Sequence, residues 1–302
     1  MVKKYETIAV VVTYNRKELL KECLTALLNC NGADKLGVLI IDNHSSDGTK
    51  DYIKDFLAKK NVFYYDTGEN LGGAGGFNIG IRRAYSLAKK YVWVMDDDCI
   101  VQKNTLVAFI KFAKEKRDNF GFLGSKVLWK DKSIAKFTVQ REKIFLPLRN
   151  FDRSTRVVCN SFVSCFINKE IIKELGLPIK DFFIWTDDWE YTRRISRKYQ
   201  CYFIADSVVM HKSKKNTDGN IVLENGERLP RYKYIYRNEY YLYRREGFWG
   251  LLYIFLRNRY NYIMILLKSK SKKLEKINLI RYATKEGKTF FPEIEKITEE
   301  DK

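Results

Sequence analysis

The segment VFYYDTGENLGGAGGFNIGIRRAYSLAKKYVWVMDDD, residues 62–98, decides the fold of this chain. It opens with a short run of aromatic and β-branched residues at 62–66, continues with a helical pattern at 77–90, and closes with a second apolar run at 91–96. Short apolar runs on either side of a helical pattern are typical of a β-α-β unit. The segment therefore predicts two parallel strands in a sheet that helices cover.

The preceding residues repeat this alternation. IAVVVT (8–13) and VLIID (38–42) are predicted strands, and 17–28 and 49–60 are predicted helices. The four predicted strands each end in a polar cluster, in the order TYNR, DNHSSDG, DTGENLGGAGG and DDD. Because the carboxyl ends of parallel strands share one edge of a sheet, we expect these clusters to form a ligand site there.

Residues 105–212 are predicted to complete the same domain, which gives a first region at 1–212. The expected elements are a helix at 105–116, a hairpin near 130–133, an apolar strand at 157–167, a helix from 187 and a strand before His211. A second region, 213–302, is predicted from a change of composition.

The composition limits the class of protein. The 302 residues are 45% hydrophobic and carry a net charge of +19, and that apolar content excludes a disordered chain. Six cysteines without a C-x-x-C pair and two histidines support neither a disulfide framework nor a zinc cage, so a reduced, cytoplasmic setting is expected. The amino-terminal run has no small-residue cleavage site and is interpreted as a buried strand, not a signal peptide.

The second region is predicted to be helical, basic and aromatic. Residues 228–288 contain sixteen Lys and Arg against four Glu. The apolar stretch 247–267 is interrupted by Arg257, Asn258 and Arg259 and is not expected to span a bilayer. The final EIEKITEEDK is predicted to be a frayed acidic end.

Within 247–267, helical spacing separates two kinds of side chain. Arg257, Asn261 and Lys268 form a polar side. The apolar residues that lie mostly elsewhere are Trp249, Leu252, Phe255, Ile263 and Leu267. This pattern predicts an interfacial helix on an anionic membrane surface. The alternative is a helical hairpin packed on the first region, with solvated basic faces.

Three adjacent carboxylates end the predicted strand at 91–96. Asp96, Asp97 and Asp98 repel one another unless a cation or hydrogen-bond donors neutralise them, and Mg²⁺ or Mn²⁺ favours such oxygens. Side chains alternate along an extended segment, so Asp96 and Asp98 can point at one ion while Asp97 serves another role. A solvated turn is the alternative. His211 can complete the site, although isolated histidines are more often satisfied core or surface residues.

Two further segments stand at the same predicted edge. Asp42 ends a strand and is interpreted as an acceptor for a nucleoside, whereas Ser46 and Asp47 are interpreted as helix caps. ENLGGAGGFNIG (69–80) places four glycines between a strand and a helix, which favours close approach of backbone to an anionic ligand. A flexible loop is the alternative, and the spacing matches neither a Rossmann fingerprint nor a P-loop.

The segment FFIWTDDWEYTRR (182–194) stands at a predicted transition into a helix. The helix dipole accounts for acidic residues such as Asp187, Asp188 and Glu190 there. A carboxylate beside an aromatic side chain also suits a general base with a sugar-stacking platform. The residues alone favour neither the structural interpretation nor the catalytic one.

Taken in order, VVVTYNR, LIIDNHSSDGT, ENLGGAGGFNIGI, MDDD, IWTDDWEY and His211 resemble family 2 glycosyltransferases of the GT-A fold, most closely the bacterial galactofuranosyltransferase branch. The resemblance covers residues 5–212, with weaker support from YIYRN (234–238). It implies an α/β fold with a Rossmann-like, mostly parallel sheet and helices on both faces.

The resemblance also implies roles for single residues. Nucleotide-sugar contacts are expected from Thr13, Arg16, Asp42, Asn70, Gly73 and Asp97, with Gly73 near the diphosphate. Asp96, Asp98 and His211 are expected to hold Mn²⁺ or Mg²⁺, and Asp188 is the expected catalytic base. Trp185 and Asp187 are assigned to the acceptor. The branch shows W-D-D directly, whereas Thr186 intervenes here, so Trp189 is a rival platform.

The implied activity is the inverting transfer of a sugar from a UDP-sugar, with UDP-galactofuranose as first choice. The implied acceptor is a hydroxyl of a growing, lipid-linked cell-surface polysaccharide, such as a capsule or O-antigen. The expected location is cytoplasmic, peripheral at the inner face of the cell membrane, and a homo-oligomer is left open.

Two alternatives to this activity are carried. One is a rhamnosyltransferase that uses dTDP-rhamnose. The other is a basic protein that binds nucleic acid or another polyanion. The second leaves the three aspartates unexplained, so no nucleic-acid partner is expected.

Overall fold

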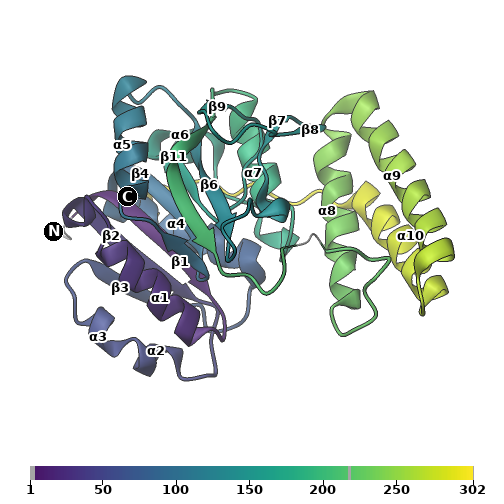
Figure 1. Ribbon diagram of the computed structural model, residues 1–302, viewed down its shortest axis with the longest axis horizontal. Helices are drawn as coiled ribbons and strands as arrows, with labels where there is room; N and C mark the ends of the chain where they lie inside the picture. Colours follow the sequence, from purple (N-terminus) through teal and green to yellow (C-terminus); the bar gives the residue numbers. More distant parts are fainter. Residues whose placement is uncertain (1–3, 217–218, 302) are drawn as a thin grey trace.

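The computed structural model describes residues 4–216 and 219–301. Residues 1–3 and 302, at the ends of the two predicted regions, and 217–218 lie outside this part. Figure 1 shows a sheet covered by helices and, beside it, three helices from the last third of the chain. The predicted α/β architecture is confirmed.

The first hundred residues form the predicted β-α-β units. The elements are β1 (Tyr5–Thr13), α1 (Lys17–Leu28), β2 (Leu36–Asp42), α2 (Thr49–Tyr52), α3 (Lys54–Leu57), β3 (Val62–Asp66), α4 (Gly72–Leu87) and β4 (Ala88–Asp96). The helix predicted at 49–60 is broken in two, because Ile53 leaves helical geometry at φ −104° and ψ 12°.

The second half of the sheet domain is more irregular. Its elements are β5 (Cys99–Val101), α5 (Thr105–Glu115), β6 (Phe122–Trp129), β7 (Arg141–Lys143), β8 (Leu146–Pro147), β9 (Thr155–Arg156), β10 (Cys165–Asn168), α6 (Lys169–Leu175), α7 (Asp187–Ser196) and β11 (Tyr202–His211). Short 3₁₀ turns lie at Ala33–Lys35, Lys136–Thr138, Lys180–Phe182, Leu229–Arg231 and Glu299–Asp301.

The strand predicted at 157–167 is wrong for most of its length, since only its end belongs to β10. The buried side chain of Asn160 donates to the main-chain oxygens of Ser161 and Ser164. These local bonds hold the backbone in a bend, in place of the bonds of a strand ladder.

The sheet has the order β3-β2-β1-β4-β10-β6-β11-β5, with β9 paired to β11. Strands β3, β2, β1 and β4 are mutually parallel, whereas β10 runs antiparallel to β4 and β6. The chain order reverses at β1, which has β2 on one side and β4 on the other. Such a reversal leaves a crevice at the carboxyl ends of the strands, where open α/β sheets bind ligands.

Both faces of the sheet are buried under helices. On β1, Ala9 and Val11 pack with α1 and α5, and the alternate residues Val10 and Val12 pack with α4. Helix α4 approaches β1 so closely that a Cβ atom on Gly80 would lie 2.4 Å from a Val10 methyl carbon. This sandwich explains why the strands read as continuous apolar runs.

Three helices follow: α8 (Tyr232–Arg244), α9 (Gly247–Lys268) and α10 (Lys273–Thr289). Figure 1 shows α8 nearest the sheet domain, with α9 and α10 farther out. Glu246, between α8 and α9, accepts from both Arg193 and Arg197 and so joins this bundle to the region around α7. Among the described residues, no helix is long and apolar enough to cross a membrane.

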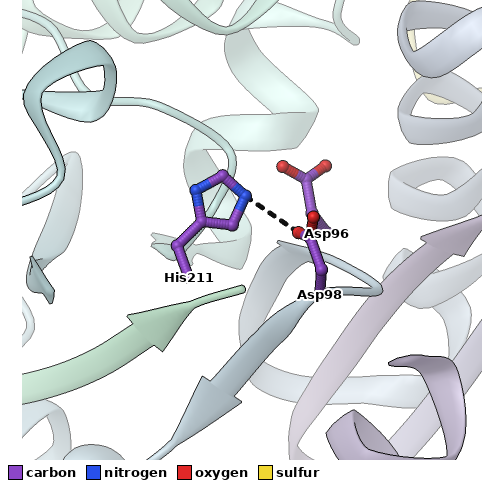
Figure 2. A group of neighbouring side chains, drawn as sticks. All are labelled: Asp96, Asp98 and His211. Atoms are coloured by element: carbon purple, nitrogen blue, oxygen red, sulfur yellow. Dashed lines mark ion pairs between the residues drawn. The ribbon is translucent and has the colours of Figure 1, made fainter. Parts of the chain in front are cut away.

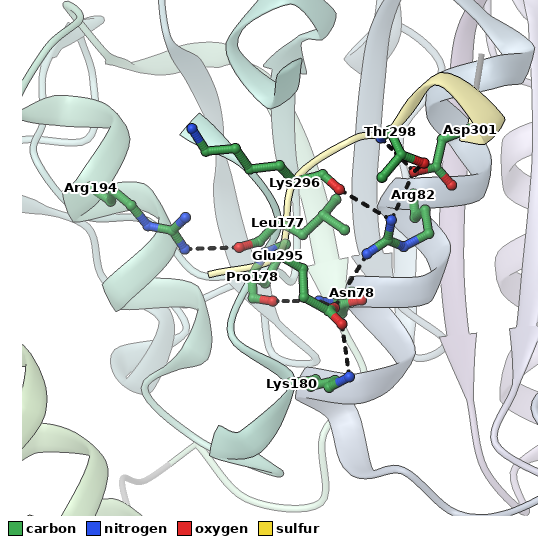
Figure 3. A network of polar contacts seen from close by, with 10 residues as sticks. All are labelled: Asn78, Arg82, Leu177, Pro178, Lys180, Arg194, Glu295, Lys296, Thr298 and Asp301. Carbon is green, nitrogen blue, oxygen red and sulfur yellow. Dashed lines mark hydrogen bonds and ion pairs between the residues drawn. The ribbon is translucent and has the colours of Figure 1, made fainter. Parts of the chain in front are cut away.

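The frayed carboxyl end predicted from EIEKITEEDK is a wrong prediction for the described residues. Figure 3 shows this segment running back across the sheet domain, where Glu295 and Asp301 meet residues of α4. Glu295 accepts from Asn78 at 2.9 Å and from Lys180 at 2.8 Å, and Asp301 accepts from Arg82 at 2.8 Å. The acidic end has cationic and amide partners that lie far away in sequence.

Candidate active site

The four polar clusters meet at one edge, as predicted. Strand register pairs Thr13 with Asp42, Asp42 with Asp66, and Val12 with Asp96. The last residues of β1, β2, β3 and β4 therefore lie in one row, and the candidate site lies at and beside these strand ends.

Asp96, Asp98 and His211 converge beside this edge (Figure 2). After the aspartates, β5 runs to β11 and pairs with it, with Cys99 opposite His211. One ligand atom from each of the three residues lies within 4.8 Å of the others, and His211 Nε2 is 2.8 Å from Asp98 Oδ1. Residues 113 positions apart in the sequence thus form one cluster.

Burial makes this cluster electrostatically unusual. Removal from water, together with the charge of Asp98, raises the pKa of Asp96 to about 6. Burial would also raise the pKa of Asp98, but the contact with His211 outweighs it and lowers that pKa. Burial opposes a charged His211, yet Asp98 raises the pKa of the imidazole above its usual value. Asp98 and His211 therefore stabilise each other as an ion pair.

The cluster also has the chemistry of a divalent-metal site. Two carboxylates and an imidazole are donors that Mn²⁺ accepts, and Mg²⁺ takes the carboxylates with water. His211 Nδ1 is buried and has no hydrogen-bond partner among the described residues. A cation would offset the burial and the charge of Asp98, which together raise the pKa of Asp96. The residues present fit such an ion.

Asp97 lies outside the Asp96–Asp98–His211 cluster and has partners of its own on β1 and beside it. One of its oxygens accepts from Thr13 Oγ1 at 2.8 Å and the other from Arg16 at 3.0 Å, while Arg16 also reaches Asp98 at 3.1 Å. Burial raises the pKa of Asp97 to about 7, and Arg16 opposes this shift. Asp97 holds two residues expected to contact the nucleotide, and its own contact with the nucleotide stays a prediction.

Asp42 and its neighbours are tied into the same edge. Asp42 is 1% exposed, and its carboxylate accepts from Tyr64 OH at 2.6 Å and from the Ser45 amide at 2.8 Å. Each carboxylate oxygen has capacity for another donor, so the nucleoside role stays a prediction. The N-cap of α2 is Gly48, so neither Ser46 nor Asp47 is the predicted cap: Asp47, one residue earlier, accepts from the Thr49 amide at 3.1 Å, and the Ser46 amide donates to Asn15.

The glycine-rich run differs from the expected loop, because α4 already begins at Gly72 and most of the run is its first turns. Gly72 has φ +71°, and a Cβ atom there would lie 2.1 Å from the main-chain oxygen of Phe183. Asn70 accepts from the Gly72 amide at 3.0 Å and starts the helix. Of the four glycines in 72–76, Gly73 is the one that has both a negative φ and no atom within 4 Å of where a Cβ atom would lie. This open space suits the expected closeness to a diphosphate.

The segment 183–186 brings Asp187 and Asp188 to the site. Phe183, Trp185 and Thr186 all have positive φ, between 63° and 70°. Non-glycine residues keep this backbone form only where their surroundings impose it. The Phe183 oxygen accepts from the Ala74 amide of α4 at 3.1 Å, which fixes one side of the segment.

The two carboxylates that follow begin α7. Burial raises the pKa of Asp188 to about 7 and the pKa of Asp187 well above its usual value, and the charge of Asp96 contributes to both shifts. Asp187 is buried, whereas Asp188 is partly exposed. Asp188 is therefore the carboxylate that can meet a ligand.

Asn238 on α8 fixes the other side of segment 183–186, and the sequence reasoning missed it. Its side-chain amide lies 3.0, 3.2 and 2.9 Å from the main-chain oxygens of Phe182, Ile184 and Trp185. Arg237 Nε donates to Asn238 Oδ1 at 3.0 Å and so orients the amide. The signal in the sequence was the RN pair of YIYRN, which gave only family resemblance and no role.

Comparison with known proteins agrees with this geometry. The model of the glycosyl transferase family 2 matches residues 8–176. The chain belongs to family 2. This confirms the family resemblance found in the sequence.

Curated relatives in family 2 match shorter parts. Galactofuranosyltransferase GlfT1 of Mycobacterium tuberculosis is 33% identical over 112 residues, 36% of this chain and 35% of the relative. The Mycolicibacterium smegmatis protein of that name is 32% identical over 90 residues, 30% of this chain and 29% of the relative. The chain thus matches about a third of the length of these relatives.

Solved structures share the GT-A fold. Staphylococcus aureus TarS 1–349 in complex with UDP has a TM-score of 0.56 at 14% identity, covering 94% of this chain and 72% of its own. A mannosyltransferase of Pyrobaculum calidifontis in complex with GDP-Man and Mn²⁺ also has a TM-score of 0.56, at 15% identity, covering 93% of this chain and 74% of its own. The predicted fold is confirmed.

In this family 2 chain, the rival tryptophans occupy different environments. Trp185 packs on Tyr232 of α8, with ring centroids 5.4 Å apart. Trp189 lies under the guanidinium of Arg141, whose central carbon is 4.3 Å from the ring centroid. Both are partly buried, so the choice of acceptor platform stays a prediction.

Proposed function

We propose that this protein is an inverting glycosyltransferase that moves galactofuranose from UDP-galactofuranose to a hydroxyl of a lipid-linked, growing cell-surface polysaccharide. The observation that carries the proposal is the nearness of two groups: the Asp96–Asp98–His211 cluster beside the ends of β4 and β11, and the carboxylate of Asp188 in the first turn of α7, whose pKa the charge of Asp96 raises. A nucleotide-sugar transferase needs a place for the leaving diphosphate and a base for the acceptor. These two groups supply both.

Asp96, Asp98 and His211 would hold Mn²⁺ or Mg²⁺, and such a cation neutralises charge that develops on a departing diphosphate. Thr13, Arg16, Asp42 and Asn70 would position the nucleotide, with the Gly73 backbone near its phosphates. Arg16 is half exposed and has guanidinium nitrogens left for a phosphate oxygen.

Asp188 would act on the acceptor. Its carboxylate takes the hydroxyl proton as the hydroxyl oxygen bonds to the anomeric carbon, and the bond from that carbon to the diphosphate oxygen breaks with its electron pair. Attack from the face opposite the diphosphate inverts the configuration. A pKa of about 7 matches a general base that works near neutral pH.

The choice of sugar rests on the relatives named galactofuranosyltransferase. The direct test incubates the purified protein with UDP-galactofuranose, UDP-glucose, UDP-N-acetylglucosamine or dTDP-rhamnose, with Mn²⁺, Mg²⁺ or EDTA, and measures nucleotide release and donor binding. We expect release from UDP-galactofuranose that EDTA abolishes. Metal-dependent release from dTDP-rhamnose alone would replace galactofuranose with rhamnose, and salt-sensitive DNA binding without turnover of any donor would overturn the proposal.

A further inference from the structure

Helix α9 has the reverse of the polarity expected for a solvated surface helix. Three of its polar residues face inward, where Arg257 pairs with Glu239, Asn258 donates to Thr284 at 3.0 Å, and Asn261 donates to Tyr236 OH at 2.8 Å. Two members of the predicted polar side, Arg257 and Asn261, therefore pack against α8, whereas the third, Lys268, is exposed, and most of the apolar side is turned to the outside. The sequence left two alternatives, an interfacial helix and a packed hairpin with solvated basic faces. The helices do pack as a bundle, but the outer surface of α9 is mainly apolar and not basic.

The outward side is a largely apolar surface, which we name the α9 face; one cation lies within it, the exposed Arg259, whose guanidinium carbon is 5.1 Å from the ring centroid of Phe255. The apolar residues of the α9 face are Phe248, Trp249, Leu251, Phe255, Leu256, Tyr260, Ile263, Leu266 and Leu267, each between 42% and 73% exposed. These nine are more than half of the seventeen exposed large hydrophobic residues among the described part of the chain. Soluble monomers seldom leave such a patch in water, so the α9 face marks a contact surface.

Basic side chains border the α9 face at its carboxyl end. Lys268, Lys270, Lys272 and Lys273 are all exposed and lie within six residues, and Glu275 is the acidic group beside them, 3.9 Å from Lys272. At the other end Arg245 is exposed and lies 3.8 Å from Glu190, while Glu246 is occupied by Arg193 and Arg197. Apolar and aromatic residues bordered by cations match the interface of a membrane that contains anionic lipid.

A second copy of the chain fits this surface less well. If two α9 faces packed antiparallel, the lysines of one copy would meet the Arg245 end of the other. If they packed parallel, the lysines would meet each other. Either arrangement places like charges together, with only Glu275 beside the lysines and Glu190 beside Arg245 in each chain, whereas lipid phosphates satisfy the lysines directly.

We propose that the α9 face lies on an anionic lipid membrane, with its aromatic and aliphatic side chains among the acyl chains and its bordering lysines at the headgroup phosphates. This contact is independent of the transfer reaction proposed above. It would hold the catalytic edge near a lipid-linked acceptor.

The test is vesicle flotation of the full-length protein, which reads membrane contact without turnover. Vesicles of phosphatidylcholine with roughly 30% phosphatidylglycerol are compared with pure phosphatidylcholine at low and high salt. The test variant is Leu256→Glu with Leu267→Glu, at positions 57% and 73% exposed. The matched control is Tyr52→Glu with Val107→Glu, two exposed apolar positions on α2 and α5 with the same change of charge.

We expect wild type and control to float with the anionic vesicles. The test variant should bind them at least about tenfold more weakly, because two apolar anchors are replaced by charges. Charge reversal at Lys268 and Lys270 should remove the preference for anionic over neutral vesicles. Equal flotation of the test variant and wild type would overturn the proposal. So would a wild-type dimer in sedimentation that the same variant dissociates, with no flotation in either form. Matching circular dichroism melts identify variants that are folded.

Discussion

The side-chain amide of Asn238 on α8 lies 2.9 Å from the main-chain oxygen of Trp185, which stands three residues before Asp188. The same amide also meets the oxygens of Phe182 and Ile184. A residue of the helical bundle thereby holds the backbone that begins α7. The bundle is part of the site, and the proposed base depends on it.

Asn238→Ala should lower turnover by more than its loss of stability explains. Removing the amide leaves buried carbonyls without donors, which costs about 1–3 kcal/mol of unfolding free energy. Segment 183–186 then relaxes toward ordinary φ values and displaces Asp188. At assay temperatures below the melting temperature, kcat should therefore fall by about tenfold or more. The measurements are donor-saturated kinetics and thermal melts.

The control for that change is Asn258→Ala, which removes a comparably buried amide from the same bundle. Its turnover should stay within about twofold of wild type at a similar cost in stability. If both variants lost turnover in proportion to stability, Asn238 would be structural only. A positioning role also predicts that Asn238→Ala shifts the acidic limb of the pH profile.

Asp188→Asn should separate binding from chemistry. The amide keeps the size of the side chain but cannot take a proton, so kcat should fall by about 10²–10⁴ while donor affinity changes little. Stopped assays of turnover and calorimetric titration with the donor measure the two quantities. Wild-type turnover would show that another group is the base.

Turnover should rise with pH through the neutral range. Asp188 must be ionised to accept a proton, and burial raises its pKa to about 7, so kcat should increase tenfold per pH unit well below 7 and level off above it. A bound cation near Asp96 favours the ionised form and moves this limb to lower pH. A flat profile between pH 5 and 8 would contradict the assignment.

Asp98→Ala should abolish metal-dependent donor binding. The change removes one proposed ligand and the hydrogen-bond partner of His211, so calorimetry with Mn²⁺ and UDP should show no heat where wild type binds. Asp66→Ala is the matched control, since Asp66 ends strand β3 of the same sheet and lies outside the cluster. Equal donor affinity in the Asp98 variant would remove this residue from the metal site.

Glu295→Gln should destabilise the fold at neutral pH. The charge is lost from bonds with Asn78 and Lys180, at about 1–2 kcal/mol of unfolding free energy. Burial would raise the pKa of Glu295, but these partners lower it, so its stabilisation is present above the unfolded pKa near 4.3 and disappears as pH falls through the folded value. Urea unfolding at pH 7 and pH 3 should show a smaller deficit at pH 3 than at pH 7, and Glu293→Gln should show none at either.

Local pattern predicted the first half of the fold closely. The helix at 17–28 and the strand at 62–66 have their predicted bounds, because periodicity and flanking polar residues are local properties. Polar residues at the ends of parallel strands also predicted that Asp42 and Asp96 share an edge, since parallel register fixes where strands end. By contrast, the strand at 157–167 was overturned by Asn160, whose buried side chain competes with the ladder.

The amino-acid sequence by itself determined the sheet edge, the three aspartates that end β4, and the membership of family 2, because each depends on neighbours along the chain or on strand ends. Family resemblance grouped His211 with Asp96 and Asp98, and the tertiary structure brought His211 to 2.8 Å from Asp98. Only the tertiary structure decided that Asn238 holds the turn before Asp188 and that α9 turns most of its apolar side outward. Those contacts join residues tens to more than a hundred positions apart, and the side that a helix buries depends on the partners that pack against it.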